Sequence, residues 1–382
     1  MQILSPFILP IHPISYFYRH MSKFDFHTLM VEAIIPETKE AYSIRFRPTE
    51  PPINYLAGQY LTLRVQIDGA AHRRAYSLSS APGLDDALQI SIKREPNGLV
   101  SNYLADNLKV GDFMESMAPT GNFSISPKAQ RPRHYFLIGA GSGITPLFSM
   151  LRTILHHEPQ SEVSLWYGNR NRESIMFRED LAALSKQYPA RLHVLHSLSQ
   201  PESDWKGYRG RLTQERIYDL VSEVFMRSEL PKVYFLCGPP GLMEAAEAAL
   251  DKHAVNFNEV HRELFHIPVE TLLEQSQESV PVPLSKRPEI SSQRVSITLR
   301  GEVTELNVDP EESILDAAIQ ADLDPPYACQ GGICTSCLAR LTQGKVYMDR
   351  TDALSQQEID EGYILTCQSH PLDDEVSLVF EE

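Results

Sequence analysis

The sequence predicts a multidomain protein with an antiparallel β-barrel domain, an α/β domain built on a parallel sheet, and a small α+β domain. Three observations predict this arrangement. The 382 residues exceed what one hydrophobic core usually organises. Short alternating apolar runs give way near residues 127–133 to strand-like runs that alternate with helical patterns. A proline-rich segment then separates both parts from a cysteine-rich C-terminal part.

The N-terminal part, residues 24–130, is typical of an antiparallel sheet or small barrel. Residues 60–67 and 88–93 alternate between apolar and polar side chains, and glycines and prolines mark turns between such runs. Residues 1–23 form a predicted N-terminal extension, which is apolar but interrupted by Pro6, Pro10 and Pro13. The extension lacks a basic leader and a small-residue cleavage site, so a secretory signal is a poor fit and a cytoplasmic location is expected.

The middle part, residues 131–266, predicts an α/β domain. Its strand-like runs cover residues 134–138, 163–167, 192–197 and 233–237. Helical patterns lie between them at residues 145–156, 177–187 and 213–221, and such alternation predicts a parallel, doubly wound sheet. Residues 267–293 hold four prolines among Ser and Glu and predict an exposed linker. Residues 294–382 then predict a hairpin and a helix at residues 313–320.

The charge is unevenly distributed along the chain. The formal net charge is −15, and residues 294–382 carry 5 Lys and Arg against 18 Asp and Glu, leaving 30 against 32 for the rest. An acidic segment on a nearly neutral body excludes a nucleic-acid binder, because the phosphate backbone would repel it. The acidic surface serves either solubility or docking to a basic partner. No run of 18 uncharged apolar residues occurs, so no membrane span is expected.

Four of the five cysteines gather near the C-terminus in a pattern that predicts a metal cluster. They are Cys329, Cys334, Cys337 and Cys367. The spacing C-x4-C-x2-C followed by a distant fourth cysteine suits a [2Fe–2S] cluster, whereas structural zinc sites usually have two short cysteine pairs. Zinc stays the alternative. The residues from about 294 to the end, including Thr366-Cys-Gln368, resemble plant-type ferredoxins, and the resemblance implies a β-grasp fold.

Two short motifs in the N-terminal part predict a flavin site. The first is Arg74-Ala75-Tyr76-Ser77, in which Tyr76 can stack on a flat ring, Ser77 can hydrogen-bond the ring edge and Arg74 can neutralise phosphate. The second is Gly98-Leu99-Val100-Ser101, which opens a predicted helix at residues 101–107 whose N-terminus can bind a phosphate. Together they resemble the ferredoxin–NADP reductase superfamily and imply FAD, with FMN as the alternative. A surface strand with a buried tyrosine is the plain reading of the first motif.

Two glycine-containing motifs in the middle part predict a nicotinamide nucleotide site. The sequence Gly139-Ala-Gly141-Ser-Gly143-Ile-Thr145 follows a strand and leads into a helix, so its backbone can approach a pyrophosphate. The sequence Cys237-Gly238-Pro239 follows another strand at the carboxyl edge of the sheet, where ligands of such folds bind. The superfamily resemblance places Cys237 beside the nicotinamide. A small buried side chain is the alternative for Cys237.

Four further residues extend the site by resemblance to oxygenase-type reductases. Arg170 and Arg172 match the side that binds the adenine ribose, which slightly favours NADPH over NADH, although each is also an ordinary surface arginine. Phe265 matches an aromatic residue that covers the flavin, and Glu263 matches an acidic residue at its N5 edge. A core Phe and a surface Glu are the alternatives.

The order of domains resembles that of oxygenase and desaturase reductases, with the phenylacetyl-CoA epoxidase type favoured. The resemblance implies an electron-transfer enzyme that takes hydride from NAD(P)H and passes single electrons through FAD and a [2Fe–2S] cluster to a non-haem iron oxygenase or desaturase. Two alternatives stay open. One is a self-contained oxidoreductase of small acceptors such as quinones or ferric iron, and the other is a redox-sensing module.

Overall fold

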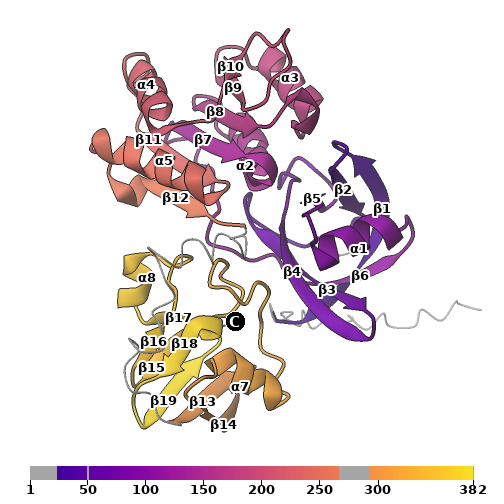
Figure 1. The fold of residues 1–382 in the computed structure, drawn as a ribbon, viewed down its shortest axis with the longest axis vertical. Coiled ribbons are helices and arrows are strands. Elements are labelled where there is room, and N and C mark those ends of the chain that lie inside the picture. Colours follow the sequence, from indigo (N-terminus) through magenta and orange to yellow (C-terminus); the bar gives the residue numbers. More distant parts are fainter. Residues whose placement is uncertain (1–23, 50, 266–292, 382) are drawn as a thin grey trace, which may run out of the picture.

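The computed structural model describes residues 24–49, 51–265 and 293–381, which form three domains (Figure 1). The predicted extension 1–23 and residues 267–292 of the predicted linker lie outside the described residues. Each domain matches its predicted fold class, so the three-part architecture is confirmed. In Figure 1 the N-terminal domain lies to the right in indigo and violet, the central domain at the top in magenta and salmon, and the C-terminal domain at the bottom in orange and yellow.

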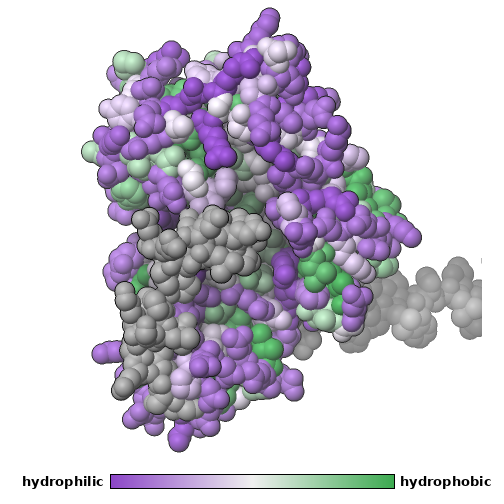
Figure 2. Space-filling model, viewed as in Figure 1, coloured by the Kyte–Doolittle hydropathy of each residue, from purple (hydrophilic) through white to green (hydrophobic). Residues whose placement is uncertain are grey.

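The N-terminal domain is one antiparallel six-stranded sheet curved around an apolar core. Its elements are β1 (Phe26–Pro36), β2 (Ala41–Phe46), β3 (Tyr60–Ile67), β4 (Ala70–Ser77), β5 (Gln89–Lys93), α1 (Leu99–Asn107) and β6 (Phe113–Met117). The strand order is β4-β3-β6-β1-β2-β5. Alternate residues of these strands, such as Ile44, Leu61 and Leu63, pack in the core, as the period of two predicts. Figure 2 shows hydrophobic residues gathered over this domain on an otherwise largely hydrophilic face.

The central domain is a parallel six-stranded sheet with helices on both faces. Its elements are β7 (His134–Ala140), α2 (Ile144–His157), β8 (Glu162–Asn169), α3 (Arg178–Gln187), β9 (Leu192–Leu198), β10 (Tyr208–Arg209), α4 (Gln214–Phe225), β11 (Lys232–Cys237), α5 (Pro240–Lys252) and β12 (Val260–Glu263). The order β10-β9-β8-β7-β11-β12 puts β7 and β11 side by side. One face buries side chains of α2 and α3, and the other buries side chains of α4 and α5. The two glycine-containing motifs therefore lie at the carboxyl ends of two adjacent strands, β7 and β11.

The C-terminal domain is a mixed sheet packed on one helix. Its elements are β13 (Gln293–Leu299), β14 (Glu302–Val308), α7 (Ile314–Gln320), β15 (Leu338–Gln343), β16 (Val346–Met348), α8 (Gln356–Asp360), β17 (Tyr363–Leu365), β18 (Ser369–Pro371) and β19 (Glu375–Val379). The main sheet has the order β14-β13-β19-β15-β17, and β16 pairs with β18. Ser313 caps α7 by accepting a hydrogen bond from the Asp316 N–H, and Asp316 accepts one from the Ser313 N–H in return. None of the described helices is long and apolar enough to cross a membrane.

Candidate functional site

The glycine loop after β7 lies so close to the end of β11 that no larger residue fits. A Cβ on Gly143 would lie 2.2 Å from the carbonyl oxygen of Cys237, and Gly141 has a φ of +56°. A Cβ on Gly139 would lie 2.7 Å from the side chain of Leu147, so Gly139 permits close packing of α2 on the sheet. The buried Thr145 hydroxyl donates a hydrogen bond to the Ser142 carbonyl and holds the loop in place.

These motifs open into a pocket of about 520 Å³ at the carboxyl edge of the parallel sheet. Gly141, Gly143, Gly238 and Pro239 line it, whereas Gly139 and Thr145 lie behind its wall. Backbone N–H groups at the start of α2 and the favourable helix dipole suit a pyrophosphate in this pocket. The pocket therefore has the size and the lining of a nucleotide site.

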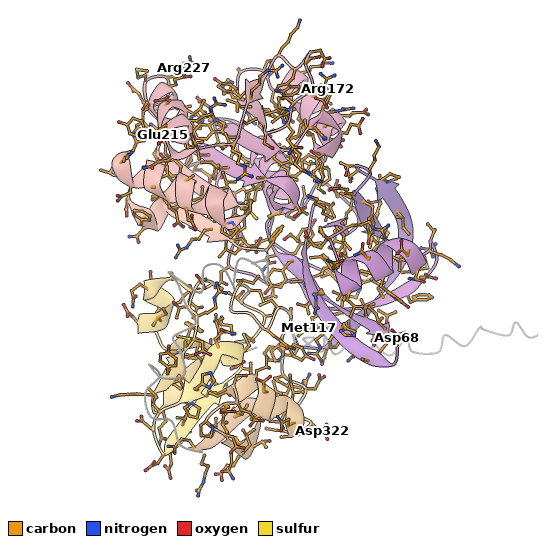
Figure 3. The ribbon with its side chains drawn as sticks, viewed as in Figure 1. Asp68, Met117, Arg172, Glu215, Arg227 and Asp322 are labelled. Carbon is orange, nitrogen blue, oxygen red and sulfur yellow. The ribbon has the colours of Figure 1, made fainter. Side chains whose placement is uncertain are left out.

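The two arginines predicted to face the ribose take different positions. Arg170 lines the pocket and forms an ion pair with Glu40 of the N-terminal domain. Arg172 lies outside the pocket, where its guanidinium forms an ion pair with Asp204, and Figure 3 shows it near the outer end of the central domain. Arg211, in contrast, lines the pocket.

Three residues from three separate strands converge where the N-terminal and central domains meet. Ser77 at the end of β4 hydrogen-bonds the carboxyl group of Glu263, and Glu263 pairs in register with Cys237 across β12 and β11. Burial raises the pKa of Glu263 to about 8, so its carboxyl group is neutral over much of the physiological range. Burial also raises the pKa of the Cys237 thiol. The arrangement can therefore hold a proton at the Glu263 carboxyl without charging the site.

Phe265 follows this cluster directly and lines the nucleotide pocket while it packs on the core of the central domain. An aromatic side chain here covers one wall of the pocket with apolar surface. The predicted quartet of Ser77, Cys237, Glu263 and Phe265 is thus brought together at one domain junction.

The two predicted flavin motifs lie next to each other in the N-terminal domain. Arg74 is exposed on β4, Ala75 and Tyr76 are half-buried, and Ser77 is buried. The charges of Arg74 and Glu95 both act on the Tyr76 side chain. Glu95 in turn donates its backbone N–H to the Ser101 hydroxyl of the second motif. Burial raises the pKa of Tyr76, which stays neutral. Tyr76 thus links the strand motif to the turn that carries the second motif.

Gly98 caps α1 with extended backbone, and a Cβ there would lie 2.6 Å from the Ser101 hydroxyl oxygen. Leu99 is 49% exposed, whereas the Val100 side chain packs in the barrel core and leaves only its backbone for a ligand. The free N–H groups of this helix start suit a phosphate. The residues present therefore fit a flavin: Arg74 and the start of α1 would hold its phosphates, and Tyr76 and Ser77 would hold its ring.

The four C-terminal cysteines lie in two pairs around one loop. Cys334 Sγ lies 3.1 Å from Cys329 Sγ, which is too long for a disulfide, and Cys337 hydrogen-bonds Cys367. The hydrogen bond with Cys334, together with backbone N–H groups that include Gly331, lowers the pKa of Cys329. Gly331 donates its N–H to Cys329 Sγ at 3.4 Å.

Two thiol pairs match the ligand set of a [2Fe–2S] cluster. Among residues 24–49, 51–265 and 293–381, no three Cys, His, Asp or Glu side chains could share a single metal ion. A [2Fe–2S] cluster needs two thiolates on each iron, which two thiol pairs supply. Gly332 has a φ of +73°, and a Cβ there would lie 2.9 Å from the Gln368 side chain. The loop is therefore shaped so that backbone N–H groups point at the sulfurs.

Comparisons with known proteins match each domain in turn. Residues 28–125 match the model of the oxidoreductase FAD-binding domain, residues 137–248 the oxidoreductase NAD-binding domain, and residues 297–372 the 2Fe-2S iron-sulfur cluster binding domain. The E subunit of 1,2-phenylacetyl-CoA epoxidase from Escherichia coli is 36% identical over 93% of this chain and 98% of its own length. The chain belongs to the flavin iron–sulfur reductase family.

Other relatives match nearly the whole chain. The ferredoxin reductase component of 3-ketosteroid-9-alpha-monooxygenase from Rhodococcus rhodochrous is 34% identical over 92% of this chain and 96% of its own length. The structure of phthalate dioxygenase reductase has a TM-score of 0.57 at 22% identity and covers 93% of this chain and 98% of that chain, which shows a shared fold. This reductase is therefore an NAD(P)H-dependent oxidoreductase with FAD and a [2Fe–2S] cluster, and the FMN and zinc alternatives are set aside.

Several residues at the site carry no motif that the sequence could have revealed. Lys93 and Glu95 of the N-terminal domain close one side of the nucleotide pocket in the central domain. Ser197 near the end of β9 and Ser199 just after it also line the pocket, and Ser197 donates a hydrogen bond to the Gly210 carbonyl. The available signal was position, because Ser197 ends the predicted parallel strand at residues 192–197 and Ser199 follows it.

Proposed function

We propose that this reductase delivers electrons to a separate oxygenase, and that a non-haem iron oxygenase of the phenylacetyl-CoA epoxidase type is the favoured recipient. The single observation that supports it most is the 36% identity to the epoxidase component from Escherichia coli over nearly the whole of both chains. The monooxygenase reductases among its relatives support the broader class of oxygenase recipients. We also propose a cytoplasmic location, because that compartment supplies NAD(P)H.

The order of the domains gives each cofactor one task. Bound FAD accepts two electrons as a hydride and releases them one at a time, which a one-electron cluster requires. Gly141 and Gly143 would hold the pyrophosphate of NAD(P)H, and Gly238 would bound the nicotinamide. Ser77 and Glu263 would orient the flavin edge and hold a proton there, while Phe265 would exclude water.

The choice between NADPH and NADH rests on the ribose end of the pocket. We propose NADPH, with Arg170 and the neighbouring Arg211 as the cations that meet a 2′-phosphate. Arg170 would exchange its ion pair with Glu40 for the phosphate. Exchange of this kind is inexpensive at an exposed site, where ion pairs contribute little.

The proposed function is tested by reconstitution with purified oxygenase subunits. NADPH oxidation and substrate oxygenation are measured with a phenylacetyl-CoA epoxidase oxygenase, and NADPH oxidation is measured in parallel with a quinone and a ferric chelate. The proposal expects the oxygenase to accelerate NADPH oxidation above the small-acceptor rates and to yield product in proportion. Equal or faster turnover with small acceptors would favour a self-contained oxidoreductase, and slow turnover with every acceptor would favour a redox sensor.

A further inference from the structure

Arg73 is a buried cation whose polar partners belong to another domain. It lies on β4 between His72 and Arg74, and its side chain is 5% exposed. Its guanidinium donates to the Pro325 carbonyl at 2.9 Å and forms an ion pair with Asp324. Both acceptors belong to the segment of the C-terminal domain that leads to the first cluster ligand. A buried cation is tolerated only when it is paired, so these bonds tie the two domains together.

Two aromatic rings complete the surroundings of Arg73. The guanidinium carbon lies 4.3 Å from the centroid of the Tyr327 ring and 5.0 Å from that of Phe26. Tyr327 belongs to the C-terminal domain and Phe26 to β1, so the guanidinium is held between one ring from each domain. Such stacking favours arginine over lysine, because the planar group fits the ring faces.

A second contact joins the same sheet to the cluster loop itself. The hydroxyl groups of Tyr60 and Ser336 lie 2.9 Å apart, and the Thr62 hydroxyl lies 3.4 Å from that of the same serine. Ser336 lies between the second and third cluster ligands, and Tyr60 pairs in register with Ser77 across β3 and β4. The cluster loop is thus docked one strand away from the proposed flavin edge.

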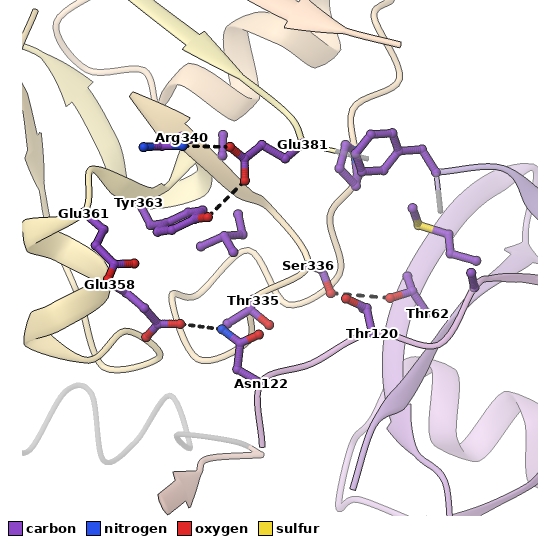
Figure 4. A pocket seen from close by; sticks show the side chains of 16 residues that line it. Thr62, Thr120, Asn122, Thr335, Ser336, Arg340, Glu358, Glu361, Tyr363 and Glu381 are labelled. Atoms are coloured by element: carbon purple, nitrogen blue, oxygen red, sulfur yellow. Dashed lines mark hydrogen bonds and ion pairs between the residues drawn. The ribbon is translucent and has the colours of Figure 1, made fainter. Parts of the chain in front are cut away.

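Apolar side chains also join the two domains: Phe24 and Met117 belong to one buried cluster with residues of the C-terminal domain, and the ring centroids of Phe24 and Phe380 lie 6.4 Å apart. A pocket of about 430 Å³ beside these contacts is lined by both domains, with Thr62 and Asn122 from one and Ser336 and Tyr363 from the other (Figure 4). Arg73 adds a buried charged contact to these apolar ones, and its partners Asp324 and Pro325 must stay in place for that charge to remain paired.

We propose that Arg73 is a positioning residue that clamps the C-terminal domain onto the N-terminal domain in the orientation for internal electron transfer. The proposal rests on the proposed electron route and adds a named clamp to it. In the step that Arg73 positions, reduced FAD loses one electron and the oxidised cluster gains it, and no bond forms or breaks. The rate of such a step falls steeply with distance, so loosening the clamp slows it.

The test compares Arg73→Ala with Arg45→Ala in the full-length, FAD- and cluster-loaded chain. Arg45 is a matched control, because its ion pairs with Glu32 and Asp86 stay within the N-terminal domain. Stopped-flow absorbance reports flavin reduction by NADPH, and freeze-quench EPR reports cluster reduction. We expect R73A to slow cluster reduction about tenfold or more, with flavin reduction and FAD content at wild-type values, since breaking a buried charged pair disfavours the docked state.

Further variants and a structural readout separate clamping from misfolding. Asp324→Asn removes the charge but keeps a residue that tolerates the φ of +46° at this position. We expect D324N to slow cluster reduction less than R73A, because Arg73 keeps its bond to the Pro325 carbonyl and its ring contacts, and the double variant to be no slower than R73A. The rate of cluster reduction in Arg73→Lys should lie between those of the wild type and R73A, because lysine keeps the positive charge but lacks the planar guanidinium. Small-angle X-ray scattering should show a larger radius of gyration for R73A than for R45A.

The possible outcomes separate this proposal from the function on which it rests. If NADPH reduces the cluster in the wild type, and reduces it equally fast in R73A with an unchanged radius of gyration, the proposed clamp is wrong. The electron route then stands. If NADPH does not reduce the wild-type cluster at all, the electron route itself fails.

Discussion

The carboxyl group of Glu263 shows how one buried residue can carry both a chemical role and a stability cost. Its Oε2 has no hydrogen-bond partner among the described residues, and its one side-chain partner is the Ser77 hydroxyl. Such a group is more stable protonated than charged, which is why burial raises its pKa. The superfamily resemblance predicted this residue, but only the pairing of β12 with β11 explains its environment.

Replacing Glu263 with Gln should remove a pH dependence of stability. The folded-state pKa of about 8 exceeds the ordinary value of 4.5, so the folded chain binds more protons and wild-type stability falls as pH rises through this window. We expect E263Q to be more stable than wild type by about 2–4 kcal/mol near pH 8 and by much less near pH 5. Thermal unfolding of the FAD-free chain followed by circular dichroism measures this. A constant difference across the window would contradict the assignment.

Gly143→Ala should damage nucleotide use, whereas Gly241→Ala should not disturb the fold. The added methyl group at position 143 would meet the Cys237 carbonyl oxygen at 2.2 Å, but no heavy atom lies within 4 Å of a Cβ at position 241. We expect G143A to lower NADPH–ferricyanide activity by about tenfold to a hundredfold through displacement of the pocket wall. Steady-state kinetics of both variants provide the check. Wild-type activity in G143A would contradict the close contact between this loop and the Cys237 carbonyl.

At the scale of elements, the loop from Cys329 to Cys337 depends on two adjacent glycines in unequal ways. Gly332 has a positive φ and a close neighbour in Gln368, while a Cβ on Gly331 would have its nearest contact at 3.8 Å. We expect Gly332→Ala to cost about 1–2 kcal/mol of loop stability. Iron content and EPR intensity should drop in G332A and stay near wild type in G331A. Equal cluster content in both would contradict the loop geometry.

The sequence predicted regular elements well and contacts between domains poorly. The predicted strand 60–67 coincides with β3, because its apolar side chains alternate with a period of two and all but one of them enter the barrel core. Helix α1 begins at Leu99, two residues before the predicted start, since Gly98 caps it. The sequence predicts the cysteine ligands because their spacing is typical of the site. It does not predict the roles of Arg73 and Lys93, because contacts between domains produce no periodic pattern in the sequence.

At the scale of the whole molecule, the acidic charge gathers in the domain that carries the cluster. A basic recipient would be steered to that domain, and salt screens such steering. We expect electron transfer to the oxygenase to slow by about tenfold between about 0.05 M and about 0.5 M salt. Reduction of a neutral quinone should change little over the same range. A salt-independent oxygenase rate would mean that the acidic surface serves solubility alone.

The proposed electron route runs from NAD(P)H through FAD to the [2Fe–2S] cluster. Anaerobic titration of the loaded chain with NADPH and then NADH, followed by visible absorbance and EPR, tests it most directly. The route predicts loss of flavin absorbance followed by a rhombic S = 1/2 signal from the reduced cluster, with NADPH effective at the lower concentration. Flavin reduction with a cluster that stays oxidised would contradict the route and leave direct reduction of small acceptors as the activity of this chain.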